Sequence, residues 1–194
     1  MLPESITALD LSVLDFIRHT LANPVADVIM TLVTYSVEYG ILLILAFIIM
    51  MFIKNMRKTG IAMLVSSALA LILGELALKN IICRPRPFMI NGSVDLIIKT
   101  PSGFSFPSSH TALCFAAATV IYLFHKRIGI AAYIYAAAVA FSRMYLYVHY
   151  PSDVLGGIVL GVCCGLISVT AIKFIGGRIE LSKKKNSAEK EQSQ

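Results

Sequence analysis

Two histidines and an aspartate form the pattern in this sequence that could do chemistry. His149 and Asp153 are four residues apart, so the carboxylate could hold the imidazole in one tautomer and leave its other nitrogen free as a nucleophile. His110 ends the tetrapeptide Pro-Ser-Ser-His at 107–110 and is available as an acid and a base. The pattern predicts attack by one histidine, with proton transfer by the other.

Basic side chains and a pair of serines accompany the histidines. The basic residues are Lys79, Arg84, Arg86 and Arg143. Arginine matches phosphate oxygens bidentately, and lysine supplies a point charge. Ser108 and Ser109 open a predicted helix, whose N–H groups and dipole favour an anion. These residues predict a phosphate site. No cluster of carboxylates stands beside it to hold magnesium, so we expect neither a metal nor another cofactor.

Three neighbouring features have open or minor roles. Arg84 could contact a substrate diphosphate or head group, but a simple interfacial cation is the favoured interpretation. Glu75 precedes Lys79 by one helical turn, so the pair could aim Lys79 or be a buried pair without a direct role. The segment Pro-Ser-Gly at 101–103 mimics the 107–110 motif without its histidine, and we assign it no role.

The elements that must position these residues are long apolar segments. Of the 194 residues, 57% are hydrophobic and 14% are charged, and the mean hydropathy is +0.78. Soluble domains are nearer to about half apolar and a quarter charged. The apolar residues gather in runs, which predicts one integral membrane domain. The net charge of +6 is spread over short loops and the tail, which argues against nucleic-acid binding.

Hydrophobic periodicity indicates where the helices lie. Residues 7–21 predict an amphipathic helix at the membrane surface, and Pro24 starts a second, partly embedded helix. The candidate spans that follow are 38–53, 59–78, 109–124, 128–148 and 153–175. Prolines and glycines predict an extended loop over 80–106. We expect an all-α, multi-pass transmembrane bundle of about five full spans, with an embedded or interfacial N-terminal helix.

These segments define three regions and an orientation. Residues 1–37 form the N-terminal interfacial or partly embedded helices, 38–178 the membrane domain, and 179–194 a disordered basic tail. Counting spans from Glu38 puts the basic turns at 54–58 and 125–127 on the side of the tail. The positive-inside rule makes that side cytoplasmic, so the C-terminus is predicted there and the phosphate site on the extracytoplasmic side.

Three short patterns, each at the end of an apolar segment, resemble the signature motifs of the type 2 phosphatidic acid phosphatase (PAP2) family. They are Lys79-x6-Arg86-Pro87, Pro107-Ser108-Ser109-His110 and Ser142-Arg143-x5-His149-x3-Asp153. That family shares its site with vanadium haloperoxidases, so the resemblance also implies their helical core. Ser109 departs from the family pattern, which usually has glycine there. We expect a helix N-terminal conformation at this position, in which serine fits.

The resemblance implies roles for the motif residues. His149 would attack phosphorus and form a phosphohistidine, Asp153 would orient it, and His110 would protonate the leaving oxygen and then activate water. The phosphoryl oxygens would be held by Lys79, Arg86, Arg143 and Ser108, helped by the backbone N–H groups of Ser109 and His110. The implied activity is metal-independent hydrolysis of a phosphate ester or diphosphate.

The expected substrate is a lipid held in the bilayer of a plasma membrane. By resemblance to small members of the family, undecaprenyl diphosphate and phosphatidylglycerol phosphate are the leading candidates, and phosphatidate is a third. Two alternatives stand beside this reading. A vanadate-dependent haloperoxidase would use the same cations, although those enzymes resemble soluble helical proteins. A non-catalytic lipid carrier or scaffold would bind without turnover, against which the His149–Asp153 pair argues. The sequence does not indicate the oligomeric state.

Overall fold

The chain folds into helices throughout the part that the structure describes. The computed structural model describes residues 3–92 and 94–192, with side chains described up to residue 178 except that of Tyr39. Within these residues there is no β-strand. Three helical stretches are long and apolar enough to cross a membrane: Lys54–Ile90, Lys126–Tyr145 and Pro151–Arg178. The prediction of an all-α chain is therefore confirmed for the described residues, with three candidate spans among them.

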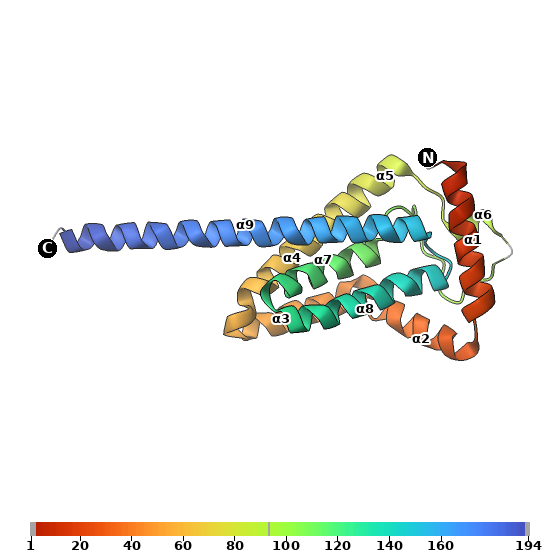
Figure 1. Ribbon diagram of the computed structural model, residues 1–194, viewed down its shortest axis with the longest axis horizontal. Helices are drawn as coiled ribbons and strands as arrows, with labels where there is room; N and C mark the ends of the chain where they lie inside the picture. Colours follow the sequence, from red (N-terminus) through yellow and green to blue (C-terminus); the bar gives the residue numbers. More distant parts are fainter. Residues whose placement is uncertain (1–2, 93, 193–194) are drawn as a thin grey trace.

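Twelve helical elements make up this part of the chain (Figure 1). In order they are α1 (Glu4–Leu21), α2 (Pro24–Tyr35), the 3₁₀ turn η1 (Glu38–Gly40), α3 (Ile41–Phe52), η2 (Lys54–Met56), α4 (Arg57–Leu71), the π-helical η3 (Ile72–Leu78), α5 (Lys79–Ile82), α6 (Pro87–Ile90), α7 (Ser109–Phe124), α8 (Lys126–Tyr145) and α9 (Pro151–Gln192).

The N-terminal helix α1 lies across one end of the bundle rather than along it (Figure 1). It buries Leu14, whereas Leu9 and Phe16 are 67% and 66% exposed. The amphipathic helix at the membrane surface stays a prediction. After it, Asn23 caps α2 by accepting hydrogen bonds from Val25 N and Ala26 N at 3.1 and 2.9 Å. An unexpected feature of α1 is a buried acid, Asp10, on its inner face.

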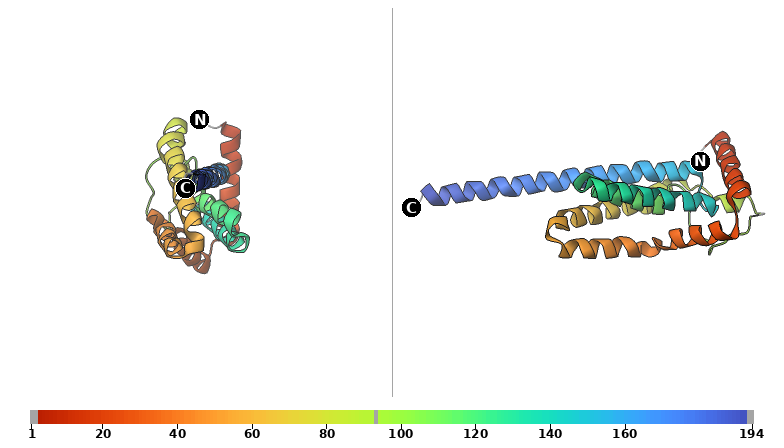
Figure 2. Two further views of the ribbon diagram at one scale, coloured as in Figure 1. Left: turned by 90° about the vertical axis from the view of Figure 1, so that its left-hand side faces the viewer. Right: turned by 60° about the horizontal axis from the view of Figure 1, so that its bottom comes forward.

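Helices α2 and α3 follow one another along the bundle (Figure 2, right). Each has 12 residues, and η1 joins them through Gly40, whose φ of +70° favours glycine. Helix α7 is also short, with 16 residues. These three helices are apolar but shorter than the three stretches that could cross a membrane by length alone.

Helix α7 is the centre of the bundle and packs against α4, α8 and α9. The packing against α9 is close because glycines of α9 face it. A Cβ at Gly161 would lie 2.4 Å from Ala112 O, and one at Gly157 would lie 2.6 Å from Ser108 O. Small residues of this kind let two helix backbones approach. The approach brings the first turn of α9 to the first turn of α7, where Ser108 N donates to Asp153 O at 3.1 Å.

Two boundaries differ from the sequence prediction. The helix expected over 128–148 ends at Tyr145 because Tyr147 takes a left-handed conformation, with φ of +60°. The tail expected to be disordered over 179–194 continues as helix α9 to Gln192, which corrects the assignment up to that residue, while residues 193–194 lie outside the described part of the chain. Lysine, glutamate, alanine and glutamine are good helix formers, and no proline interrupts this stretch.

The basic turns and the motif residues lie at opposite ends of the bundle. The connections from α3 to α4 and from α7 to α8 are at the end away from α1 (Figure 1). The first turns of α7 and α9, the last turn of α8 and the short helices α5 and α6 are at the α1 end. The three motifs therefore meet at one end of the bundle, as the span order requires.

Candidate active site

A polar cavity of about 540 Å³ lies at the α1 end of the bundle. Six of the eight predicted site residues line it: Lys79, Arg86, Ser109, His110, Arg143 and His149. The other two, Asp153 and Ser108, are fully buried behind it. The cavity thus brings together residues from all three sequence motifs.

His149 lies in the turn between α8 and α9 with its side chain 2% exposed. Its Nδ1 is 3.5 Å from Asp153 Oδ2, and its Nε2 is 3.3 Å from Arg86 Nη1. Arginine can only donate, so Nε2 must be the acceptor and the ring proton must sit on Nδ1, toward the carboxylate. This assignment puts the ring's lone pair on Nε2, where it accepts from Arg86 and faces the cations of the cavity.

The surroundings of His149 keep it neutral. Burial lowers its pKa well below the usual 6.5, and the positive charges of Arg86, Arg143 and Lys79 lower it further. Both effects disfavour a second ring proton, because a buried cation among cations is costly. At neutral pH the imidazole is therefore in the form that can attack an electrophile.

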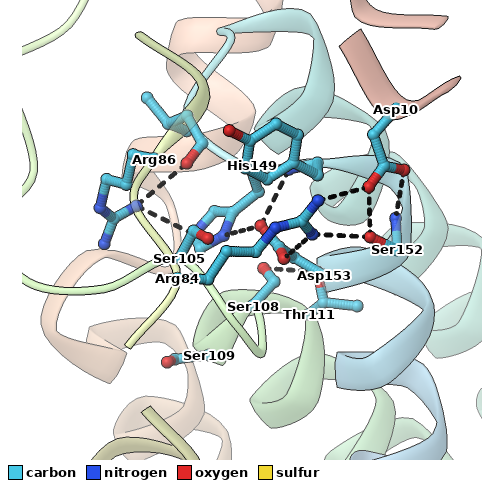
Figure 3. Close-up of polar contacts among 12 residues, drawn as sticks. Asp10, Arg84, Arg86, Ser105, Ser108, Ser109, Thr111, His149, Ser152 and Asp153 are labelled. Atoms are coloured by element: carbon cyan, nitrogen blue, oxygen red, sulfur yellow. Dashed lines mark hydrogen bonds and ion pairs between the residues drawn. The ribbon is translucent and has the colours of Figure 1, made fainter. Parts of the chain in front are cut away.

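Asp153 is in the first turn of α9 and is completely buried. Its two oxygens have separate partners (Figure 3). Oδ2 accepts from Tyr150 N at 2.9 Å and faces His149, while Oδ1 accepts from Arg84 Nη1 at 2.7 Å. The carboxylate is thus fixed from both sides, which suits a group that orients an imidazole.

Three backbone carbonyls hold Arg86 in the cavity wall. Nε donates to Gly103 O at 2.9 Å, Nη2 to Ser102 O at 3.0 Å, and Nη1 to Val148 O at 3.1 Å. Gly103 has a φ of +73°, a conformation that glycine adopts at little cost. The segment 101–103, to which the sequence analysis gives no role, therefore positions a phosphate-binding candidate.

Lys79 and Ser109 meet at one carboxylate, that of Glu75 in η3. Lys79 Nζ is 2.7 Å from Glu75 Oε1, and Ser109 Oγ donates to the same oxygen. The predicted pair of Glu75 and Lys79 is therefore present. Glu75 lies in a π-helical turn, a distortion that is frequent at functional sites. A phosphate entering the cavity would find a lysine already held in place.

Arg143, at the end of α8, is 3% exposed and reaches toward α2. Its Nη1 donates to Thr34 Oγ1, which is fully buried. Its Nε has no hydrogen-bond partner among the residues that the structure describes. A buried guanidinium with a spare donor beside a polar cavity is suited to bind an anion.

His110 has a carboxylate neighbour of its own. Its Nε2 lies 3.5 Å from Glu38 Oε2, contributed by η1, and the two side chains are 23% and 35% exposed. Both residues line the polar cavity. Nothing in the sequence motifs includes Glu38. The only sequence signal is an acidic residue at the edge of an apolar run.

Ser108 is the predicted phosphate-binding residue that does not line the cavity. It is the N-cap of α7, but its hydroxyl accepts from Thr111 Oγ1 at 2.9 Å and caps no backbone N–H. Ser109 is the first residue of α7 and has no positive φ, which confirms the expected helix N-terminal conformation. Among the two serines, the geometry favours Ser109 as the one that faces a ligand.

A second, apolar cavity of about 630 Å³ opens beside the polar one. Its walls come from α3, α4 and α7, with Leu43, Phe47, Leu64, Leu71 and Leu113 among the lining side chains. The two cavities share Glu75, Ser109 and His110. A phosphate site therefore adjoins a space of the kind that hydrocarbon fills.

Comparison with known proteins identifies the family of this chain. The family model described as the PAP2 superfamily matches residues 37–176. The chain belongs to the PAP2 superfamily. The matched range contains all three motifs, the apolar cavity and every lining residue of the polar cavity except Tyr35, and it begins just before η1. It leaves out α1 and α2.

Named relatives of this PAP2 member include phosphatases of polyprenyl lipids. An undecaprenyl-diphosphatase from Sulfolobus acidocaldarius is 33% identical over 122 residues, 62% of this chain and 59% of the relative. The bacitracin transport permease protein BcrC of Bacillus licheniformis is 35% identical over 127 residues, covering 64% and 60%. The chain spans about three fifths of the length of these relatives.

Solved structures extend the likeness over most of the fold. LpxE of Aquifex aeolicus aligns with a TM-score of 0.73 at 30% identity and covers 84% of this chain and 95% of LpxE. A transmembrane PAP2-type phosphatidylglycerolphosphate phosphatase from Bacillus subtilis aligns with a TM-score of 0.72 at 24% identity and covers 92% and 89%. The second comparison supports the fold alone.

Proposed function

We propose that this PAP2 protein is a metal-independent phosphatase of a membrane lipid phosphate or diphosphate. The observation that carries the proposal is the state of His149. It is neutral, its Nδ1 proton faces Asp153, and its Nε2 lone pair shares a cavity with three cations. Only a strongly anionic electrophile suits such a nucleophile, and a phosphate group is the biological one that fits.

In the first half of the reaction, His149 Nε2 attacks phosphorus and the bond from phosphorus to the leaving oxygen breaks. Lys79, Arg86, Arg143 and the N-terminus of α7 at Ser109 stabilise the charge on the phosphoryl oxygens. Ser108 would contribute by holding that first turn in place. The imidazole becomes positively charged as it gains phosphorus, and Asp153 stabilises that charge. His110 donates a proton to the leaving oxygen.

In the second half, water displaces the histidine from phosphorus. His110, now neutral, takes a proton from the water, and the P–N bond to His149 breaks to release inorganic phosphate. Both histidines then return to their starting states. Glu38 lies 3.5 Å from His110 Nε2 and would stabilise positive charge on that ring during proton transfer.

The apolar cavity supports a lipid substrate. It adjoins the polar cavity at His110, the residue proposed to protonate the leaving oxygen. A lipid whose chain occupied the apolar cavity would present its phosphate to His149 and its leaving oxygen to His110. The undecaprenyl diphosphate in the name of one relative meets this description, and so does phosphatidylglycerol phosphate. Phosphatidate meets it as well.

The positions of the helices and the basic turns also indicate how the protein lies in the bilayer. We propose five crossings: α2 with α3, α4 with η3, α7, α8 and the first part of α9, with α1 at the surface. Joined through η1, α2 and α3 are long enough together to cross, at a rise of about 1.5 Å per residue. The basic turns then face the cytoplasm of a plasma membrane, and the site faces outward. A cysteine at Asp95, in a cysteine-free background, should react with an impermeant reagent in intact cells, whereas one at Lys126 should not.

Phosphate release from purified protein in detergent tests the activity. The panel is undecaprenyl diphosphate, phosphatidylglycerol phosphate and phosphatidate, each with excess EDTA. We expect release from at least one lipid, and none from His149→Ala. Activity abolished by EDTA and restored by magnesium would contradict metal independence. Binding without turnover would indicate a carrier, and bromide oxidation with added vanadate would indicate a haloperoxidase.

A further inference from the structure

Arg84 is a buried cation that does not reach the phosphate cavity. Its side chain is 4% exposed, and the cavity lining includes Lys79, Arg86 and Arg143 but not Arg84. The interfacial role favoured from sequence is therefore wrong, since an interfacial cation keeps its charged group in water. A buried guanidinium needs partners for its five donors, and those partners indicate its role.

The guanidinium of Arg84 joins two carboxylates from distant parts of the chain (Figure 3). Nη1 donates to Asp153 Oδ1 at 2.7 Å, and Nη2 donates to Asp10 Oδ2 at 2.7 Å. The same group lies over the ring of Tyr150, with its central carbon 3.7 Å from the ring centroid. The contacts fix the guanidinium in one plane, so it holds Asp153 in one orientation.

Asp10 is the charged residue farthest from His149 in this series of contacts. It projects inward from α1 and is 5% exposed. Its Oδ1 accepts from Ser152 N at 3.1 Å, and its Oδ2 accepts from the Ser152 hydroxyl as well as from Arg84. A carboxylate buried on the inner face of an otherwise amphipathic helix is costly unless it has such partners. The contacts tie α1 to the first turn of α9.

The order of charges has a consequence for His149. The charges alternate from one contact to the next. Asp10 is negative, Arg84 is positive, Asp153 is negative, and the imidazole of His149 becomes positive when it is phosphorylated. Arg84 alone would hold Asp153 in place but would also offset its negative charge. Asp10 neutralises part of the charge on Arg84, so Asp153 is held and still able to stabilise a cationic imidazole.

We propose that Asp10 and Arg84 are positioning residues for Asp153, and that α1 is thereby part of the catalytic machinery of this phosphatase. The inference rests on the proposed function. It goes beyond the sequence motifs, because Arg84 is outside them and Asp10 lies in a helix outside the matched family range. Neither residue touches the cavity, so both act on the reaction through Asp153.

The test measures the phosphorylation step in four variants: Arg84→Lys, Arg84→Met, Asp10→Asn and the double variant Arg84→Met with Asp10→Asn. The burst amplitude with an activated aryl phosphate counts active sites, and the burst rate reports the chemistry. Loss of a supporting outer contact typically costs about 10–100-fold. We expect this loss in the burst rate of the Arg84 variants and a smaller one in Asp10→Asn, with KM within about twofold because the phosphate contacts are intact.

The double variant and a matched control complete the design. Because both residues act along one path, the double variant should be no slower than Arg84→Met alone. Asp15→Asn is the control: Asp15 is also on α1 and accepts from Tyr147 Oη at 2.7 Å, but it does not contact Arg84 or Asp153. It should keep the wild-type burst rate. Asp10→Glu, which keeps the charge, should recover part of the rate lost in Asp10→Asn.

Three outcomes would overturn the inference. Variants with a wild-type burst rate but a reduced amplitude or melting temperature would show a structural role only. Fully additive losses would separate Asp10 from Arg84. Wild-type protein that forms no phosphoenzyme and hydrolyses no lipid phosphate would remove the proposed function and this inference with it. If Arg84→Met does not fold, Arg84→Lys and Asp10→Asn, which change less volume, decide between these outcomes.

Discussion

Two histidine–carboxylate pairs, each with its histidine in the cavity wall, differ in burial and support. In the His149–Asp153 pair the side chains are 2% and 0% exposed, and two further groups bind the carboxylate. In the His110–Glu38 pair they are 23% and 35% exposed. The nitrogen-to-oxygen distance is 3.5 Å in both. The same chemical pair is thus embedded in one case and accessible in the other.

The difference matches two different tasks. A nucleophile must present one nitrogen along one line to phosphorus, so a fixed ring in one tautomer is an advantage. A proton carrier must exchange protons with a leaving oxygen and then with water, so it has to remain in contact with the cavity. We read the buried pair as the nucleophile and the accessible pair as the acid and base.

Removing His149 should have the largest effect. His149→Ala loses the covalent path, so no phosphohistidine should form and phosphate release should fall by about 10⁴-fold or more. Acid-labile incorporation of labelled phosphate measures the intermediate, and a melting curve in detergent checks the fold. Phosphate found on His110 in this variant would exchange the roles of the two pairs.

Removing His110 should have a smaller effect that depends on the substrate. The alcohol of a lipid phosphate monoester would leave as an alkoxide, so its oxygen needs a proton. The nitrophenolate of p-nitrophenyl phosphate leaves readily without one. General acid help is worth about 10²–10⁴-fold, so His110→Ala should slow the phosphorylation burst of the lipid by that factor and of the aryl ester far less. Phosphohistidine should then accumulate with the aryl ester, because water activation is also lost. Equal losses in both bursts would remove the acid role.

The nucleophile pair could be predicted from sequence because its information is local. His149 and Asp153 are one helical turn apart, and the spacing alone predicts a contact. Hydropathy likewise indicates the apolar segments. Their order across a membrane predicts which segment ends lie on the same side. The start of the helix that Asn23 caps was predicted in the same way, from the proline at its first position.

The supporting contacts could not be predicted because they join distant segments. Asp10 and Arg84 are 74 residues apart, and Thr34 and Arg143 are 109 apart. No spacing rule relates such residues, and an acid on an amphipathic helix ordinarily faces water. Glu38 was missed for the same reason, since it meets His110 only when η1 lies beside α7. The contact between His110 and Glu38 could therefore be identified only from the folded structure.

Lowering the pH should destabilise the folded protein because His149 is buried. The pKa of His149 is well below 6.5 in the folded protein, whereas an unfolded histidine titrates near 6.5. The unfolded chain therefore takes up this proton first, and stability that is complete above pH 6.5 is lost as pH falls toward the folded pKa. The loss is at most about 1.4 kcal/mol per pH unit, or about 2 kcal/mol at pH 5.

The measurement is a set of melting curves in detergent at pH 7.5, 6.5 and 5. His149→Gln, which cannot take the proton, is the reference, so other titrating groups cancel in the difference. Between pH 7.5 and pH 5, the melting temperature of the wild type should fall more than that of this variant. Equal losses would mean that the imidazole at position 149 can be protonated in the folded protein, and would remove the contrast in burial between the pairs.

The smallest effect is expected from Glu38, and it gives the sharpest comparison. Glu38→Gln and Asp153→Asn remove one negative charge from each pair without changing its shape. Glu38 is partly exposed, so water screens its interaction with His110, and such pairs are worth about 1 kcal/mol or less. We expect the lipid phosphorylation burst to slow by less than about tenfold in Glu38→Gln, because 1.4 kcal/mol is about tenfold. Asp153 is fully buried, and Asp153→Asn should cost about 10²-fold or more. Equal losses in the two variants would show that burial does not separate the pairs, and a larger loss in Glu38→Gln would identify His110 as the histidine whose carboxylate matters most.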